Sequence, residues 1–252
     1  MAAPLVRPVV MSVYAVNGQR VLMPKRMARS TPDMKKAIYG IREDVEAAGG
    51  KFALSDLFRS YDMQLQAHLD YASGKKKAFS PPPGSSMHES GRAFDVDLKS
   101  LKMSLADFWK VAKKWGVVPI IAKPESGASE SWHFECRGSH QLVCDYYKAG
   151  KGSNFKPATA MAASAIVAAG LAHDQFKGKA EAAYIQSCLI RLGHEIGNID
   201  GDIGPKTKKI LANLGIAGAT LPERVQELDT LLQQKFPDEF FDKVPEEVGH
   251  LV

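Results

Sequence analysis

The sequence predicts an α+β fold, in which a small antiparallel sheet with helices is followed by a small all-helical C-terminal domain. Short β-prone runs and helical patterns mix in the N-terminal half without the regular alternation of a parallel βαβ fold. After Tyr147 the β-prone runs end and only helical periodicity continues. A length of 252 residues suits one larger and one smaller domain.

The N-terminal elements follow from turn and capping signals. Two β-prone runs within residues 12–23 flank Asn17-Gly18, the strongest short hairpin signal. A helix is expected from Thr31, a candidate N-cap followed by proline, to the glycine pair at 49–50. Further along, the pattern predicts a strand at 52–54, a helix at 61–74, a surface loop at 75–85, a strand at 93–98, a helix at 105–115 and a strand at 132–136.

The C-terminal part is expected to be helical and separate. Residues 149–154 combine glycine with small polar residues, a composition typical of linkers. Helices are predicted at 158–169, 179–192, 205–214 and 222–235. We therefore expect a domain at 1–148, a linker and connecting helix at 149–175, and a helical domain at 176–252.

Composition and charge exclude several classes of protein. A hydrophobic share of 45% and a charged share of 24% are ordinary for a soluble globular chain, which argues against general disorder. A net charge of +5 suits an anionic partner without identifying it. The basic run at 75–77 lacks the interleaved aromatic residues that stack on bases, so no nucleic-acid partner is expected. The most apolar stretch, 158–172, is too short to span a membrane, so no membrane insertion is expected.

The cysteines and the N-terminus indicate where the chain is made. An odd cysteine count without CxxC spacing indicates neither a disulfide framework nor a cysteine-rich metal site, although pairing of Cys136 with Cys144 after export stays open. Pro4, Arg7 and Pro8 interrupt the N-terminal apolar residues, so no signal peptide is expected. We expect synthesis in the cytoplasm.

Two of the seven histidines occur with acidic residues in a pattern that suits a metal. A catalytic zinc ion typically takes three nitrogen or oxygen ligands and keeps a fourth position for water. His88, Asp95 and His133 supply such a set. Peptide hydrolysis at such a site also needs a base for the proton of water and a cation for the oxyanion, and Glu130 and Arg59 are the candidates.

Strand geometry restricts where the base can lie. Side chains alternate along a strand, so His133 and Glu135 share one face and Glu130 falls on the other. The strand must therefore begin near Trp132, with Glu130 projecting toward the metal from the preceding loop. Glu135 would then orient His133 as a hydrogen-bond partner.

Other metal arrangements are partly excluded by the same residues. Asp97 shares a strand face with Asp95 and stays open as an alternative ligand or a supporting group. The HExxH zinc signature is excluded, because Arg92 and Asn198 occupy the positions of its second histidine. The spacing between His88 and Asp95 is by itself a weak zinc signal, since an isolated histidine is more often a hydrogen-bonded structural residue.

The segments around these residues resemble a known family. SMHESGRAFD is similar to the SxHxxGxAxD signature of the zinc D-alanyl-D-alanine carboxypeptidase and dipeptidase family, and ESWHFE to its ExWH motif. The arginine of LFRSYDMQ matches one that the family carries upstream of the first motif, and the likeness covers roughly residues 30 to 140. The resemblance implies zinc ligands at His88, Asp95 and His133, a general base at Glu130, an oxyanion-stabilising Arg59, and a Ser86 that helps to hold the site or the substrate. Tyr61 and Trp132 are further candidates for substrate binding, and Trp132 could instead pack in the core.

A second resemblance lies in the C-terminal part. QSCLIRLGHEIGNIDGDIGPKTKKIL is similar to the three-helix peptidoglycan-binding domain with its central DGxxGxxT. The residues that carry the likeness are Gln186, Asp200, Gly201, Gly204 and Thr207; beyond them the family's alanine-rich run is replaced by Lys-Lys-Ile-Leu. A calcium loop is excluded, because an EF-hand would need glycine at its sixth position and glutamate at its twelfth, and neither is present.

The two resemblances imply one polymer, peptidoglycan, as substrate and anchor. We expect a zinc-dependent peptidase that hydrolyses amide bonds in peptidoglycan stem peptides, with Zn²⁺ bound in the α+β domain. A phage-type endolysin endopeptidase, released to the cell wall or periplasm by the phage, is favoured because no signal peptide is read. A D-alanyl-D-alanine carboxypeptidase of wall maturation is the alternative with the same chemistry, and a non-catalytic wall-binding protein is the alternative of another class. We expect a monomer.

Overall fold

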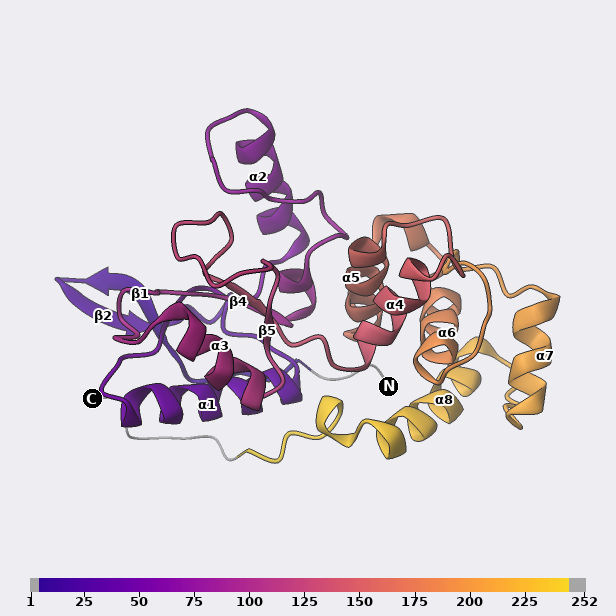
Figure 1. The fold of residues 1–252 in the computed structure, drawn as a ribbon. Helices are drawn as coiled ribbons and strands as arrows, with labels where there is room; N and C mark the ends of the chain where they lie inside the picture. Colours follow the sequence, from indigo (N-terminus) through magenta and orange to yellow (C-terminus); the bar gives the residue numbers. More distant parts are fainter. Residues whose placement is uncertain (1–4, 245–252) are drawn as a thin grey trace.

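The computed structural model describes residues 5–244, so the first four residues of the expected N-terminal domain and the last eight of the expected C-terminal domain lie outside the described part. Within it, one large hydrophobic core lies around a sheet and another among the C-terminal helices. A smaller cluster joins them, with Met87 and Ala93 from one side and Cys144 and Met161 from the other. Figure 1 shows the two parts side by side.

Six strands of the described residues form one sheet in the order β2-β1-β3-β4-β6-β5. They are β1 (Met11–Val16), β2 (Gln19–Leu22), β3 (Ala53–Asp56), β4 (Ala93–Val96), β5 (Val118–Pro119) and β6 (His133–Glu135). The α+β class is confirmed. Four neighbouring pairs are antiparallel as expected, but β1 and β3 run parallel, so the sheet is mixed. The long connection that joins these two parallel strands consists of β2, helix α1 (Pro32–Ala47) and their loops.

The hairpin expected around Asn17-Gly18 is confirmed. β1 and β2 pair antiparallel with Val16 opposite Gln19. Asn17 and Gly18 between them have φ of 51° and 78°. Two consecutive residues with positive φ are what a type I′ turn requires, and asparagine followed by glycine adopts it with the least strain.

The central strands give the sheet one apolar and one polar face. β4 and β6 pair Phe94 with Phe134 and Asp95 with His133. The rings of Phe94 and Phe134 stack 5.8 Å apart, and Phe108 meets Phe134 edge-on within the same core. Because side chains alternate along a strand, Asp95 and His133 lie together on the opposite face.

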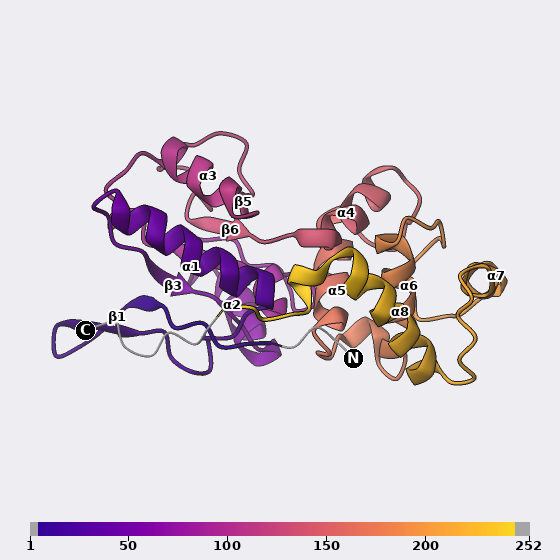
Figure 2. The same ribbon diagram turned by 90° about the horizontal axis from the view of Figure 1, so that it is seen from below.

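Helices α1 and α3 (Leu105–Lys114) contact each other, and both contribute to the core of the sheet. Figure 2 shows α3 beside α1. Ile38 and Ile41, on one stripe of α1, are fully buried. Gly40 allows the helix to approach Trp115, since a Cβ at this position would lie 2.2 Å from the indole ring. A third helix, α2 (Tyr61–Ala72), follows β3.

Five helices of the described residues form the second part: α4 (Gln141–Lys148), α5 (Pro157–Ala168), α6 (Ala180–Arg191), α7 (Pro205–Asn213) and α8 (Leu221–Lys235). The four expected helices are confirmed to within one residue at each end, while α4 was not expected. α5 is buried along most of its length and contacts both α4 and α6. The expected boundaries at 148 and 176 stay predictions. None of the described helices has the length and apolar character needed to cross a membrane.

After α8 the chain returns to α1, as Figures 1 and 2 show. Asp238 pairs with Lys36, and Asp242 pairs with Lys35, each at 2.8 Å. The Lys35 side chain is almost fully buried, whereas the pair of Lys36 with Asp238 is about half exposed.

Glu239, in this returning segment, lies in a buried ionic network between the two parts. Its carboxylate accepts hydrogen bonds from the backbone N–H of Ser139 at 2.6 Å and from Arg191 at 2.7 Å. Arg92 lies 3.4 Å from it and also pairs with Asp33 at 2.8 Å. The network therefore connects Arg92, just before β4, with helix α6 and with the turn at Pro237–Glu239.

Candidate metal centre and active site

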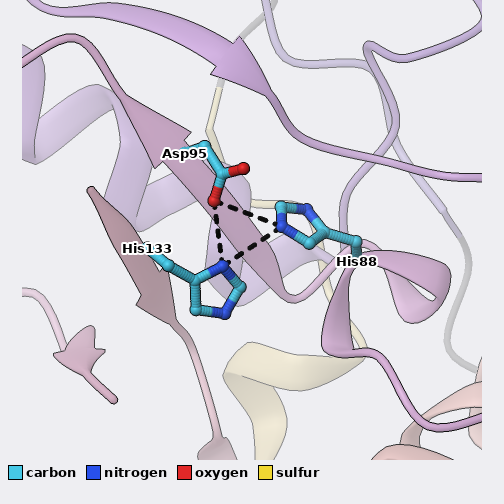
Figure 3. Close-up of side chains that lie close together, drawn as sticks. All are labelled: His88, Asp95 and His133. Carbon is cyan, nitrogen blue, oxygen red and sulfur yellow. Dashed lines mark hydrogen bonds and ion pairs between the residues drawn. The ribbon is translucent and has the colours of Figure 1, made fainter. Parts of the chain in front are cut away.

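Two strands and a short 3₁₀ helix bring three metal-ligand side chains together. Asp95 on β4 lies directly opposite His133 on β6. His88 lies in the 3₁₀ helix η1 (Met87–Ser90), and Figure 3 shows its ring directed toward the other two side chains. All three residues are buried. They form a group that can hold a metal ion, as the sequence predicts.

The direction of His88 is fixed by a capping box around η1. The Ser86 hydroxyl accepts a hydrogen bond from the backbone N–H of His88 at 3.3 Å, and the Glu89 carboxylate accepts one from the backbone N–H of Ser86 at 3.2 Å. Gly91 ends the turn with φ of 67°, a left-handed conformation that glycine adopts without strain. The chain then enters β4 in the register that presents Asp95.

The three donor atoms are separated as zinc ligands are. Nε2 of His88 lies 3.2 Å from Nδ1 of His133 and 3.3 Å from Oδ1 of Asp95, and the last two atoms are 2.9 Å apart. In a tetrahedral site with zinc–ligand bonds of about 2.0–2.1 Å, ligand atoms lie about 3.3 Å from one another. Two imidazole nitrogens and one carboxylate oxygen are also ligand types that zinc takes. The donor set therefore fits Zn²⁺.

Neighbouring acceptors orient both imidazole rings. Nδ1 of His88 lies 2.7 Å from the carbonyl oxygen of Leu57, which can only accept, so the N–H is on Nδ1 and the lone pair of Nε2 points into the group. Nε2 of His133 lies 3.6 Å from Oε1 of Glu135, which leaves Nδ1 for the metal. Arg137 in turn donates from Nε to Oε2 of Glu135 at 2.7 Å.

The electrostatics of the group favour a cation between the three side chains. Burial raises the pKa of Asp95, but the imidazoles of His88 and His133 outweigh it and hold that pKa well below its usual value. Burial lowers the pKa of His133, but hydrogen bonds and charge from Asp95 and Glu135 raise it to about 10. Positive charge is thus strongly stabilised at this point, and a divalent metal ion would supply it.

Arg59 holds the second carboxylate oxygen of Asp95. Its Nε donates to Asp56 at 2.6 Å, and its two terminal nitrogens donate to Gln64 at 3.2 Å and to Oδ2 of Asp95 at 3.4 Å. Burial lowers the pKa of Arg59, but the charges of Asp56 and Asp95 produce a net rise. A guanidinium carries five N–H groups, so two N–H groups of Arg59 take no part in these three hydrogen bonds.

Glu130 lies in the loop before β6, as the alternation of side chains along the strand predicts. The strand begins at His133, and Glu130 has φ of 65°, a left-handed conformation that is uncommon outside glycine. Its Oε1 is buried and has no hydrogen-bond partner among the described residues. Burial raises the pKa of this carboxyl group, with partial opposition from His133. An unpaired buried oxygen of this kind is suited to accept a proton from water.

A cavity of about 750 Å³ contains the metal group on its wall. Arg59 and Glu130 line it, as do two of the expected substrate-binding residues, Ser86 and Trp132. The loop at 75–85, expected at the surface, also contributes to one wall. The sequence motifs therefore converge on one concave site.

Two other residues singled out in the sequence lie elsewhere. Tyr61 is absent from the described residues that line the cavity; its side chain is 41% exposed, and its hydroxyl donates to Asp174 at 2.6 Å. Asp97 pairs with Arg20 at 2.6 Å and is not one of the three residues of the metal group. Asp97 therefore does not act as the alternative ligand in this arrangement.

Several residues that shape the site were not expected from the sequence. Glu89 carries a local signal, because Ser86 followed three residues later by glutamate is the spacing of a capping box. Asp56 lies three residues before Arg59 and was not singled out. Leu57 carries no signal, since its contact with His88 depends on how the segment after β3 lies beside η1.

The motif residues of the C-terminal part stabilise a loop from inside. Gln186, which is 2% exposed, donates from Nε2 to Asp200 at 2.7 Å and accepts at Oε1 from the backbone N–H of Gly201 at 2.7 Å. Gly201 has φ of 78°. Gly204 is the N-cap of α7, and Thr207 is buried within that helix. The motif thus fixes the connection between α6 and α7.

Comparison with known proteins gives structural likeness only. No family model matches the chain, and no curated protein matches it. The solved LdcB LD-carboxypeptidase is similar with a TM-score of 0.41 and 19% identity, over 52% of this chain and 66% of that one, so the chain spans slightly less than two thirds of its length. DacB from Streptococcus pneumoniae gives a TM-score of 0.35 and 21% identity, over 59% and 91%. The vancomycin-resistance D,D-pentapeptidase VanY, solved as a variant in complex with Zn(II), gives 0.35 and 14%, over 57% and 86%.

Proposed function

We propose that this protein is a zinc-dependent peptidase that hydrolyses an amide bond in the stem peptides of peptidoglycan. The observation that supports this most directly is that His88, Asp95 and His133 meet in a cavity that also holds the unpaired carboxylate oxygen of Glu130. Three protein ligands leave a fourth position for water or substrate, which is the pattern of catalytic rather than structural zinc sites.

The three ligands would hold the metal, and their neighbours keep them ready to do so. When bound, zinc would polarise a carbonyl oxygen and lower the pKa of its water ligand to about 7. The carbonyl oxygen of Leu57 and the carboxylate of Glu135 hold the N–H groups of the two imidazoles on the outer side, away from the donor atoms.

Glu130 is the proposed general base and, later, the general acid. Its Oε1 has no partner in the described part of the chain, so it can accept a proton from the attacking water without losing a hydrogen bond. Burial raises its pKa, and this brings the carboxyl group closer to the pH of the reaction. A carboxyl group whose pKa lies closer to the reaction pH also keeps the proton that it has accepted for longer, so that it can pass this proton to the leaving amine.

Arg59 has two proposed tasks. Through one terminal nitrogen it holds Oδ2 of Asp95, so that Oδ1 stays directed toward the two imidazoles. Its N–H groups outside the contacts with Asp56, Gln64 and Asp95 are available for the negative charge that develops on the carbonyl oxygen.

The choice of peptidoglycan rests on the motifs of both parts of the chain. The first two motifs resemble those of wall peptidases, and the segment that links α6 to α7 resembles a wall-binding domain. We propose that the region at 176–252 binds the wall and raises the effective concentration of substrate at the cavity.

Within this class we propose an endopeptidase of the phage endolysin type. The cavity of about 750 Å³ lies within the usual range of ligand-binding pockets, and its walls extend beyond the metal group to α4 and α5, which leaves room for substrate on that side. A carboxypeptidase that removes only the terminal D-alanine would use the same residues and is the alternative.

Mass spectrometry of peptidoglycan fragments tests the proposal. Purified peptidoglycan is incubated with zinc-loaded protein and, in parallel, with chelator-treated protein. Chelator-sensitive cuts within stems or cross-links support the endopeptidase, and loss of the terminal D-alanine alone supports the carboxypeptidase. Unchanged fragments with the zinc-loaded protein contradict the peptidase proposal, and retained wall binding would then favour a non-catalytic wall-binding protein.

A further inference from the structure

The cavity that contains the metal group is built by both parts of the chain. One wall comes from helices α4 and α5, which Figure 1 shows next to the part that carries the sheet. Lys148 ends α4, and Lys156 is the N-cap residue of α5. Both lysines line the cavity, together with Thr159 and Met161. The helical part is therefore in a position to select the substrate, besides any role in binding the wall.

Charge is distributed unevenly within the cavity. The acidic residues of its described lining are Asp95, Glu130 and Glu135, and all three interact with His133 in the metal group. The wall formed by α4 and α5 contributes the two lysines and no acidic side chain to that lining. The lining also contains Arg59, Arg137 and Lys76; the two arginines pair with acidic residues in or beside the metal group. The two lysines, by contrast, lie on a wall that has no acidic side chain in the lining to neutralise them.

The ammonium groups of both lysines are available to a ligand. The side chain of Lys156 is exposed and forms no hydrogen bond or ion pair with any described residue. Lys148 lies 3.9 Å from Asp145, and both side chains of this pair are more than half exposed. A surface pair at this distance contributes little energy, so a ligand can replace it readily.

We propose that Lys148 and Lys156 form a carboxylate-binding subsite of the cavity, so that its best substrates are peptides with a free carboxylate on one side of the scissile amide. The proposal rests on the proposed peptidase function and names the substrate class of that same site. Lysine binds a carboxylate through charge-assisted hydrogen bonds, which are stronger than those between neutral groups. The carboxylate can come from the C-terminus of the peptide or from an acidic residue within it.

Three soluble versions of one stem peptide distinguish these sources. The first has all its carboxylates free, the second has a C-terminal amide, and the third has its internal carboxylates converted to amides. Each is given to the zinc-loaded wild-type protein, to the double variant Lys148→Gln/Lys156→Gln, and to a control variant Lys51→Gln/Lys113→Gln. The control removes the same charge from two exposed lysines that do not line the cavity.

Replacing the cavity lysines is expected to lower kcat/KM for the all-acid peptide by about 10-fold or more. For the peptide that lacks the recognised carboxylate, kcat/KM should change less than about 2-fold. Whether this is the peptide with the C-terminal amide or the one with internal amides shows which carboxylate is recognised. The control variant should behave like the wild type. An equal loss on all three peptides, or no loss on any, overturns the subsite.

The failure of the subsite and the failure of the peptidase function give different results. If the zinc-loaded wild type cuts none of the peptides, the peptidase function fails, and calorimetric titration of the same peptides then tests the subsite alone. Tighter binding of the all-acid peptide by the wild type than by the Lys148→Gln/Lys156→Gln variant supports it. Equal binding by the two proteins contradicts it.

Discussion

At the scale of single residues, the two imidazoles of the metal group are oriented by acceptors of different kinds. His88 is held by the backbone carbonyl of Leu57, which no substitution removes, whereas His133 is held by the side chain of Glu135, itself backed by Arg137. The first contact depends only on the path of the chain between β3 and α2. The contact of Glu135 with His133 can be changed by substituting Glu135 or Arg137. The affinity of the site for a metal ion is therefore most readily adjusted through the partners of His133.

Replacing Glu130 separates catalysis from metal binding. Glu130→Gln keeps the size of the side chain but removes the proton acceptor, and the loss of a general base is expected to lower kcat by about 100-fold or more. Zinc content, measured by elemental analysis, should stay at the wild-type level, because Glu130 is not part of the metal group. A zinc-loaded variant with full activity would contradict the proposed role.

Zinc is expected to stabilise the folded protein. At a free concentration about 100 times its Kd, a ligand of the native state raises the free energy of unfolding by about 2.7 kcal/mol. For a chain of this length, this corresponds to a rise in Tm of roughly 5–10 °C. Differential scanning calorimetry with and without a chelator measures it. Asp95→Asn removes a ligand and should reduce the shift, and an equal shift in this variant would argue against the proposed site.

At the scale of elements, the close approach of α1 to the end of α3 depends on one glycine. Gly40 lies in the middle of α1, where glycine lowers helix stability by about 1 kcal/mol relative to alanine. Its place is explained by Trp115, whose ring would lie 2.2 Å from a Cβ at position 40. Packing thus overrides helix propensity at this contact.

Gly40→Ala is therefore expected to destabilise the protein by about 1–2 kcal/mol, since overpacking outweighs the gain in helix propensity. Urea unfolding measures the difference in the free energy of unfolding. The same substitution made in a Trp115→Leu background should be neutral or stabilising, because the obstructing ring is gone. If Gly40→Ala lowers the free energy of unfolding equally in both backgrounds, the clash with Trp115 is not the cause of the destabilisation.

The sequence could predict elements whose signals are local. The hairpin at Asn17-Gly18 has its turn residues, and the helices of the C-terminal part have clear periodicity. β5 was missed because Val118–Pro119 is too short to show alternation, and α4 because its N-cap, His140, makes no capping hydrogen bond. The parallel pairing of β1 with β3 was missed because it joins residues that are distant in the sequence.

The same limit applies to the candidate site. Motifs in the sequence identified the three residues that meet as the metal group and placed Glu130 before the strand. Contacts between distant segments could not be predicted from the sequence. Examples are the hydrogen bond from Arg59 to Asp95 and the position of Lys156 on the cavity wall. These depend on how the elements pack, which no short motif records.

At the scale of the whole molecule, buried ionic groups connect the two parts. Glu239 lies against both Arg92 and Arg191, which are each 1% exposed. Breaking a buried ion pair costs far more than breaking a surface one, because the remaining charge loses its partner without regaining water. The last described turn of the chain is therefore expected to contribute strongly to the stability of the junction.

Glu239→Gln should lower the free energy of unfolding at pH 7 by about 3 kcal/mol. Burial raises the pKa of Glu239, but Arg92 and Arg191 outweigh it and lower that pKa overall. Its contribution is thus present above the ordinary glutamate pKa of about 4.3 and is lost as the pH falls through the lowered folded value. Urea unfolding between pH 7 and pH 3 should show wild type and variant converging at the acidic end.

The exposed neighbour of this network provides the matched control for that experiment. Asp238→Asn removes the ion pair with Lys36, whose side chains are about half exposed, and should cost less than about 1 kcal/mol. A difference between wild type and Glu239→Gln that stays constant from pH 7 to pH 3 would mean that the carboxylate charge is not what stabilises the junction.

At position 130, the residue that suits stability differs from the residue that the proposed catalysis needs, because the backbone there is left-handed. Glycine at this position would relieve about 1 kcal/mol or more of conformational strain, but it would remove the carboxylate. A library of variants sorted only for heat resistance should therefore enrich glycine at position 130, while a library sorted for wall hydrolysis should retain glutamate. With glutamate at this position, the protein has the carboxylate that the proposed reaction needs and bears the strain of the left-handed backbone.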